Sequence, residues 1–437
     1  MRTNSGNLVR EYLPNLVIDP YKNDSVSVTL DNNSQLSSYQ YMWEKPEDIE
    51  NMLDDRIEGI SAFLANKYNL ETQAPLNTIS PIDYTTTCLI CNEGDNTMNA
   101  KSIYLQSSTA LTGSSARLKL DLTEINEYDL FPGQVVTLRG RNAYGTRLVA
   151  TSLFSNAKQP PRTPEGNGGG LKVMVAAGPF SSPEDLDYDP FVDFLDQVHQ
   201  NNPDLLVLLG PFVDVNNNLV VEGLVESTFL EVFRNRFLYR LSNVRCSVVL
   251  VPSLKDVFHS QCFPQPPINP SDENVPSFYK ESLKHVTFAP NPCTFVVNDI
   301  SFGVCTNDIL LHLSRLSLCK STTPSPTRIT KICQLLFQQQ SYYPLWPGYS
   351  TEDLSECSQI CAKQAGKLRM PYSPDVLLLT SSLMPFVEEI EGSLVVNANK
   401  LGAGNMVYSM INVAPPGNQR DNKSGPSQRT NVKIHKI

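Results

Sequence analysis

The sequence contains no long apolar run and little histidine. No stretch of about 18 consecutive apolar residues occurs in its 437 positions, and a membrane-spanning helix needs such a stretch, so no membrane partner is predicted. Residues 1–7 hold no apolar core of a signal peptide, and we therefore do not expect secretion. The ten cysteines are then expected as free thiols, because a reducing compartment does not favour disulfides.

Positive charge is also in deficit. Lysine and arginine number 35 against 45 aspartates and glutamates, for a formal net charge of -10. Tight autonomous binding to nucleic acid depends on neutralising phosphates with basic side chains, so this balance argues against it and leaves room only for a local basic patch. With 41% apolar side chains the chain can bury more than one core, and one to three domains are expected.

Two short apolar runs end in the same three residues. Residues 171–177 and 205–209 lead into Gly-Pro-Phe at 178–180 and 210–212. Each run is continuous and bounded by a breaker, which is typical of a fully buried strand that stops at a turn. The intervening segment 188–200 has apolar residues at helical spacing, so a βαβ unit is predicted. Ligands and catalytic groups of such sheets gather at the carboxyl ends of the strands, where the two triplets lie.

This layout resembles that of the calcineurin-like metallophosphoesterases. Strand ends in that family carry D-x-H, G-D-x-x-D and G-N-H-D or G-N-H-E, followed by two turns with histidines, and hold a pair of divalent ions that clamp a phosphoryl group and generate hydroxide. Here the first strand end has neither Asp nor His, and Pro211 stands where the bridging Asp belongs. The corresponding degenerate positions are Gly178, Pro179, Gly210, Pro211, Asp214, Ser253, Asp256, Ser382 and Asn397.

The histidines support the same conclusion. They are His199, His259, His285, His312 and His435. None falls at a predicted strand end, and His199 is expected near the end of the first helix of the βαβ unit. Asp214 and Asp256 alone supply too few donors for two ions. We therefore predict no catalytic residue, no metal site and no cofactor in this domain.

The chain divides into four segments by composition and pattern. Residues 1–40 are rich in Asn, Asp and Ser and are predicted to be a flexible lead-in. Residues 41–158 begin with a helix over 46–64 and continue with short alternating strands, for which an OB-fold barrel is the best candidate. Residues 159–170 form a Pro/Gly-rich linker to the α/β domain at 171–437, the degenerate phosphoesterase-like domain. The fold class predicted is multidomain α+β.

Several ordered motifs are similar to those of the B-subunit family of replicative DNA polymerases, and within it of the alpha-primase B subunits. Besides the two Gly-Pro-Phe turns, they are Leu-Phe-Pro-Gly-Gln-Val-Val at 130–136, Tyr-Asp-Pro at 188–190, Val-Pro-Ser-Leu-Lys-Asp at 251–256, Phe-Pro-Gln-Pro-Pro at 263–267 and Ser-Tyr-Tyr-Pro-Leu at 341–345. The resemblance runs from about Tyr39 to the C-terminus. The small helical domain with which the family usually begins is not visible before Tyr39, so functions attached to it are not carried over.

The resemblance implies a non-catalytic scaffold in the nucleus. Its partner would be the zinc-bearing C-terminal domain of the catalytic polymerase subunit, with the primase subunits reached through the complex and DNA contacted only indirectly or weakly. Two alternatives remain open at this point: an active phosphoesterase or nuclease with an unconventional site, and an autonomous single-strand DNA-binding OB protein. The second of these would need exposed aromatics, and residues 105–140 offer only Tyr128 and Phe131, of which Phe131 is expected in the core.

Two cysteine pairs and one Ser/Thr-rich loop invite a functional interpretation. Cys88 and Cys91 have the spacing of a zinc half-site, and Cys357 and Cys361 form a looser pair, but the first pair alternates within a predicted strand and we favour that plain interpretation. Thr323 and Ser325 precede prolines and are possible phosphosites, or simply part of an exposed loop.

Packing between the two domains is also predicted. The aromatic segment 342–349 is expected to pack as a plug on its own domain, with a partner contact as the minority interpretation. Together with the helix 46–64 it offers apolar material for clamping the barrel to the α/β domain. Gly178 and Gly210 are expected at turns that need a positive φ or have no room for a Cβ.

Overall fold

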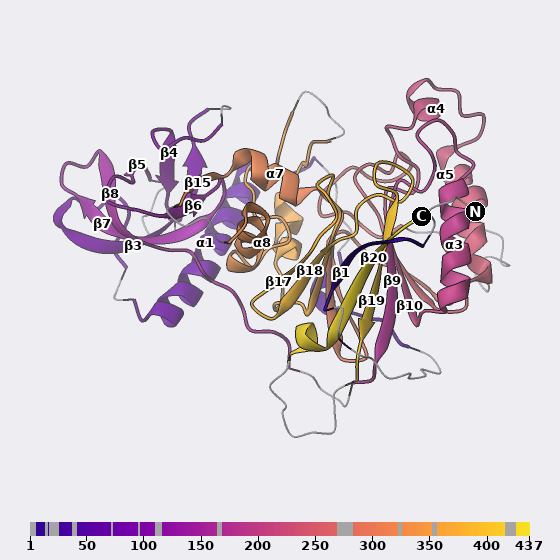
Figure 1. The fold of residues 1–437 in the computed structure, drawn as a ribbon. Coiled ribbons are helices and arrows are strands. Elements are labelled where there is room, and N and C mark those ends of the chain that lie inside the picture. The colour runs from indigo at the N-terminus through magenta and orange to yellow at the C-terminus, as the bar shows by residue number, and fades with distance from the viewer. Residues whose placement is uncertain are drawn as a thin grey trace.

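The structure of the protein is a computed structural model. It describes residues 6–13, 16, 26–36, 42–70, 73–94, 97–109, 116–163, 168–268, 283–321, 326–351, 356–415 and 425–437. Two bodies are visible in Figure 1, a barrel with its helix and a larger α/β region built on two sheets. No helix of these residues is long and apolar enough to cross a membrane.

The α/β region contains two sheets that pack face to face. The seven-stranded sheet has the order β1 (Leu8–Tyr12), β20 (Thr430–Lys436), β19 (Val407–Val413), β9 (Leu171–Ala177), β10 (Leu205–Leu209), β11 (Ser247–Val251) and β12 (Val286–Phe288). The six-stranded sheet has the order β17 (Val387–Ile390), β18 (Ser393–Asn397), β16 (Val376–Leu379), β14 (Ile300–Cys305), β13 (Cys293–Val297) and β2 (Thr29–Leu30). Side chains of both sheets share one buried core, so the sheets form the two central layers.

Helices cover the outer face of each sheet. The first set lies over the seven-stranded sheet and comprises α3 (Asp189–Asn201), α4 (Asn218–Val221), α5 (Phe229–Val232), the π-helical turn η2 (Phe233–Phe237) and η3 (Leu238–Asn243). The second set lies over the six-stranded sheet and comprises α7 (Ile309–Leu316) and α8 (Arg328–Gln338). Short 3-10 turns complete the region at η1 (Asn32–Ser34), η5 (Ala362–Leu368) and η6 (Pro426–Arg429).

The predicted βαβ unit is present as β9, α3 and β10, with β9 and β10 paired in parallel. Val173 and Val175 face the core between the sheets, whereas Met174 and Ala176 face the helices. Because both faces of β9 are buried, its sequence is a continuous apolar run rather than an alternating one. The same two-sided burial holds for β10.

The barrel is closed by five strands. They are β3 (Ser80–Asn92), β4 (Ile103–Gln106), β5 (Arg117–Asp121), β8 (Arg147–Phe154) and β7 (Val135–Asn142), in that order around the barrel. In chain order this is 1-2-3-5-4, the arrangement of a five-stranded Greek-key barrel, with β5 and β8 paired in parallel. The helix α1 (Pro46–Tyr68) packs its buried residues, including Ile57 and Leu64, against Leu89 and Val135 of the barrel.

The prediction of a flexible lead-in over residues 1–40 is wrong for its described part. The strand β1 pairs with β20 at the edge of the seven-stranded sheet, and β2 pairs with β13 of the six-stranded sheet. Leu8 and Val9 stay about half exposed, because an edge strand is held by backbone hydrogen bonds more than by side-chain burial. Such pairing to residues some four hundred positions away leaves little apolar pattern in the local sequence.

The described part of the predicted linker, residues 159–163 and 168–170, runs along the α/β region. Ser373 Oγ donates to the carbonyl of Gln159 at 2.6 Å, and Pro161 forms an isolated bridge with Ser373. A Cβ on Gly168 would lie 2.6 Å from the carbonyl oxygen of Asn298. The composition that favours a linker therefore also permits close contact with the domain surface.

Candidate functional site

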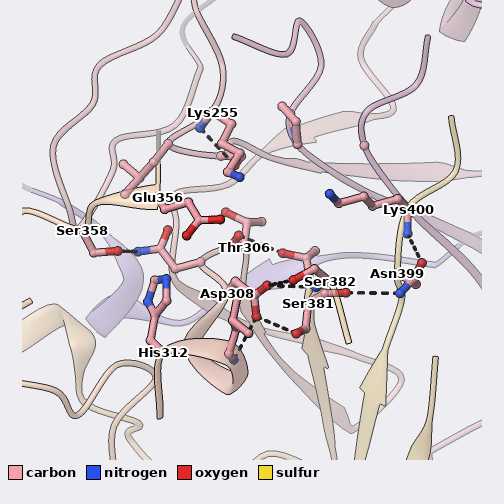
Figure 2. A pocket seen from close by; sticks show the side chains of 18 of the residues that line it. Lys255, Thr306, Asp308, His312, Glu356, Ser358, Ser381, Ser382, Asn399 and Lys400 are labelled. Carbon is pink, nitrogen blue, oxygen red and sulfur yellow. Dashed lines mark hydrogen bonds between the residues drawn. The ribbon is translucent and has the colours of Figure 1, made fainter. Parts of the chain in front are cut away.

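A pocket lies at the carboxyl edge of both sheets. The turns after β9, β10, β11, β14, β16 and β18 surround a cavity of about 120 Å³. Its polar lining, shown in Figure 2, includes Lys255, Thr306, Asp308, His312, Glu356, Ser358, Ser381, Ser382, Asn399 and Lys400. Of the degenerate positions, Gly178, Gly210, Pro211, Ser253 and Ser382 line this cavity. Asp214 and Pro179 line an adjoining cavity of about 180 Å³.

The Gly-Pro-Phe turns bring two strand ends into close contact. A Cβ on Gly178 would lie 1.9 Å from the carbonyl oxygen of Pro211, and a Cβ on Gly210 would lie 2.7 Å from the backbone nitrogen of Ser253. Neither glycine is among those with positive φ, so crowding and not backbone conformation selects glycine here, and the expectation of a positive φ is wrong. The phenylalanines of the two turns, Phe180 and Phe212, stack at 5.6 Å within the core under the helices.

Asp256 connects the turns after β10 and β11 from beneath the pocket. It is fully buried, and its carboxylate accepts hydrogen bonds from the backbone N–H groups of Phe212, Val213 (3.1 Å) and Ser253 (2.8 Å). Burial raises the pKa of Asp256 to about 7, against the lowering effect of these hydrogen bonds. Both oxygens are thus committed to the backbone, which makes Asp256 a structural link between two strand ends.

Asp214 forms an isolated β-bridge with Asp256 on the neighbouring strand end. One of its oxygens accepts the N–H of Asn216 at 3.0 Å. Burial raises the pKa of the Asp214 carboxyl, while Lys255 and Lys400 act in the opposite direction with smaller effect. Asp214 is therefore the degenerate position whose carboxylate faces open space and two cations.

Asp308 joins the end of β14 to the turn after β16. It caps α7 by accepting the N–H of Leu311 at 3.1 Å, and it also accepts the hydroxyl of Ser381 and both the N–H and the hydroxyl of Ser382. Asn397 plays a similar part below, because it is fully buried, accepts the N–H of Ser381 and donates to the carbonyl of Leu383. Ser382 and Asn397 thus brace the turn.

His312 is a pocket residue that sequence reasoning missed. It lies on α7, a few residues after β14 ends, so a count of histidines at strand ends did not include it. Its ring stacks on Tyr349 at 4.2 Å, and its Nδ1 lies 2.9 Å from the hydroxyl of Tyr343. Burial lowers the pKa of His312 to about 4, so the imidazole is neutral near pH 7. The sequence signal available was the predicted helix that follows directly on a buried strand.

The remaining candidate positions do not assemble into a site. Within the residues that the structure describes, no group of three or more His, Cys, Asp or Glu could hold a metal ion. Cys88 is buried in the barrel core on β3, as the strand interpretation requires, and Cys91 Sγ lies 3.7 Å from Gln106 Oε1. Cys357 lines the pocket, whereas Cys361 is buried. Thr323 and Ser325 lie outside the described residues.

The barrel and the α/β region share an extensive contact, as predicted. Gln339 at the end of α8 reaches the barrel strand β7, where its Oε1 accepts the N–H of Val135 at 2.8 Å and its Nε2 donates to the carbonyl of Val135 at 3.0 Å. The N–H of Trp346 donates to the carbonyl of Pro132 at 3.1 Å, and Trp346 packs against the α1 cluster. The helix 46–64 and the segment 342–349 therefore act as the expected clamp.

One face of the barrel region is covered by this contact. The strand β6 (Tyr128–Leu130) pairs with β15 (Leu318–Lys320) of the α/β region. Phe131 is fully buried, in the core that holds α7 and α8 and not in the barrel core. Lys320 lies over the ring of Tyr128 at 5.9 Å. The two aromatics that could have stacked on bases are thus engaged within the chain.

Comparison with known proteins places this architecture. Residues 173–388 match the family model for the B subunits of DNA polymerases alpha and epsilon, so the fold and its strand-edge site define the class as a B subunit of a DNA polymerase. Residues 50–156 match the model for the OB domain of the DNA polymerase alpha B subunit, which confirms the OB-fold. Among solved structures, an archaeal phosphodiesterase is 9% identical over 56% of this chain and 93% of that chain, with a TM-score of 0.28, too low to establish a common fold.

Relatives identify the family within that class. The DNA polymerase alpha B subunit of Schizosaccharomyces pombe is 31% identical over 86% of this chain and 68% of its own length. The rat protein of the same name is 32% identical over 84% of this chain and 60% of its own length, and the bovine protein 32% over 80% and 57%. The chain belongs to the family of DNA polymerase alpha B subunits. It spans about three fifths of the lengths of these mammalian relatives.

Proposed function

We propose that this chain is a non-catalytic accessory subunit of the DNA polymerase alpha-primase complex, working in the nucleus. In this role it holds the C-terminal domain of the catalytic subunit and supports the synthesis of RNA–DNA primers. The observation that carries the non-catalytic part of the proposal is the bonding of Asp256, whose two oxygens accept three backbone N–H groups. A carboxylate engaged in this way is not available to bridge two metal ions.

The other strand-end groups support the same proposal. Pro179 and Pro211 have no side-chain donor atom, and Asp308 is bonded to Ser381, Ser382 and the first turn of α7. The neutral imidazole of His312 is held by Tyr343 and Tyr349. This leaves Asp214 as a single carboxylate in open space, and hydrolysis by a dinuclear centre needs several converging ligands.

The holding function requires a rigid arm, and the contact between barrel and α/β region supplies one. Buried hydrogen bonds from Gln339 to Val135 fix the barrel against α8. Beside this contact, α1, η5 and the segment around Trp346 line a groove of about 550 Å³. A surface composed of both domains can bind a partner with a defined geometry, which two freely moving domains cannot.

The groove also has an exposed aromatic at its rim. Trp43 is 68% exposed, and its carbonyl accepts a hydrogen bond from Lys363, which lines the groove. Trp is enriched among the residues that dominate binding energy at protein interfaces. We therefore place the partner-facing surface at this groove, with Trp43 as its anchor.

Co-purification with the C-terminal domain of the catalytic subunit tests the proposal. The full chain should retain that domain, and Trp43→Ala should weaken the retention at least about tenfold, as expected for an aromatic anchor. Tyr144→Ala is the matched control, because Tyr144 is 85% exposed on the β7–β8 turn and lies far from the groove. Loss of retention in the Tyr144 variant but not in the Trp43 variant would contradict the placement, and no retention by the wild-type chain would contradict the function.

A further inference from the structure

Two lysines approach each other at the strand-edge pocket from different sheets. Lys255 follows β11 of the seven-stranded sheet, and Lys400 follows β18 of the six-stranded sheet. Both line the cavity of about 120 Å³ and the adjoining one of about 180 Å³. Figure 2 shows the two side chains reaching toward the same space from opposite sides. The fold thus concentrates positive charge at one point of an otherwise acidic protein.

Within the described residues, neither lysine has an ion-pair partner within 4.0 Å, whereas the lining carboxylates are engaged. Asp308 accepts four hydrogen bonds from Leu311, Ser381 and Ser382. Glu356 is paired with Arg315 at 2.9 Å. The groups of this pocket that still lack a counter-charge are therefore the two ammonium groups, and their mutual repulsion is relieved only by an anion between them.

We propose that this pocket binds a phosphoryl group, either as free phosphate or as the monoester of a small molecule such as a nucleotide. A phosphate monoester carries close to two negative charges near pH 7 and three acceptor oxygens, which match two ammonium groups with three N–H each. Ser253 adds a donor, because its Oγ accepts the N–H of Lys255 at 3.2 Å and leaves the hydroxyl proton directed elsewhere. This binding property goes beyond the accessory function and does not depend on it.

The cavity is large enough for such a group. A single water needs roughly 10–15 Å³ of accessible cavity volume, and the pocket offers about 120 Å³ at its centre with the adjoining cavity beyond the lysines. A phosphoryl group in the first cavity leaves the second for an ester substituent.

Asp214 opposes this binding and provides a discriminating test. It lines the adjoining cavity with both lysines, and its carboxyl is influenced electrostatically by each of them. A negative charge at this position competes with a phosphate for the same cations. Replacing Asp214 by Asn should therefore tighten phosphate binding, whereas a site of catalytic origin that used Asp214 would lose function.

Isothermal titration calorimetry of the full chain with inorganic phosphate, at low ionic strength, tests the proposal. Wild type should bind saturably, Lys255→Met and Lys400→Met should each bind about tenfold more weakly, and Asp214→Asn should bind severalfold more tightly. Lys101→Met is the matched control, because Lys101 is exposed on the barrel, and it should bind as wild type does. Adenosine monophosphate in a parallel titration separates the two sources: tighter binding than phosphate indicates an ester, and equal binding indicates the phosphoryl group alone.

The result that would overturn the proposal is the absence of saturable binding of either anion to the wild-type chain, or equal weakening by Lys101→Met and Lys400→Met. Thermal melting of each variant without ligand establishes that it folds. Should Lys255→Met fail this test, Lys255→Gln replaces it, since the amide keeps a polar end at the pocket. A rise in melting temperature with phosphate in wild type, but not in the double lysine variant, is the second expected readout.

Discussion

The α-carbon of Gly178 lies directly against the carbonyl oxygen of Pro211, so that a Cβ on Gly178 would approach that oxygen to 1.9 Å. These residues end the adjacent parallel strands β9 and β10. In a metallophosphoesterase this edge would hold metal ligands, but here it is closed by backbone contact. The stacked Phe180 and Phe212 that follow fill the core below.

The first prediction concerns the glycine at the second turn. Gly210→Val should lower the free energy of unfolding by about 1–3 kcal/mol, because the new side chain would meet Asp256 and the backbone of Ser253. Urea denaturation measures this. Gly366→Ala is the control, since a Cβ there meets nothing within 4 Å and should leave stability nearly unchanged. An unchanged midpoint for Gly210→Val together with loss of partner binding would instead make the turn an interface element.

The second prediction is a pH dependence that arises from Asp256. Its pKa is raised to about 7 in the folded state, so the folded state favours the protonated carboxyl. Stability from this group is therefore greatest below its unfolded pKa of about 4 and falls as pH rises from about 4 to 7. Comparing Asp256→Asn with wild type by denaturation at several pH values isolates this contribution. A wild-type-minus-variant difference that rises with pH in this interval would show that the sign is wrong.

The third prediction is catalytic silence. Purified chain incubated with manganese and a generic phosphodiester should show no turnover, and metal analysis should find no stoichiometric Mn, Fe or Zn, because Asp256 and Asp308 are already bonded within the protein. Turnover that persists through repurification and disappears in Asp214→Ala would refute the accessory function.

The fourth prediction concerns the contact between the two regions. Gln339→Leu leaves the buried N–H and carbonyl of Val135 without their partners, at a cost of about 1–3 kcal/mol for each group left unsatisfied. We expect earlier unfolding and faster proteolysis between barrel and α/β region. Gln200→Leu, at an exposed position on α3, is the control and should behave as wild type. Equal protease resistance of both variants would mean that this contact does not hold the regions together.

The fifth prediction is weak binding to single-stranded DNA. Phe131 is buried and Tyr128 is covered by Lys320, so the barrel face carrying them offers no exposed stacking platform. Fluorescence anisotropy with an oligonucleotide should give weak binding that disappears as salt is raised. Tight binding that survives physiological salt and depends on Tyr128 would support the autonomous DNA-binding alternative.

Local sequence determined the elements whose stabilising contacts lie close by in the chain. The buried run of β9, the helix α3 and the buried run of β10 follow from their apolar pattern, since both faces of each strand are covered. The alternation on β3 and β5 indicated the barrel, and the spacing on α1 indicated the helix that packs on it. Family membership was also readable, because short motifs in order along the chain carry it.

Tertiary structure alone decided where distant side chains meet. The strand β1 is held by β20 across more than four hundred residues, and no local pattern specifies such a partner. His312 enters the pocket because α7 starts where β14 ends, and Lys255 and Lys400 meet because two sheets present their carboxyl edges to the same space. A sequence specifies the chemistry of each side chain, but the distance between charges, which sets their interaction energy, exists only after the sheets have packed.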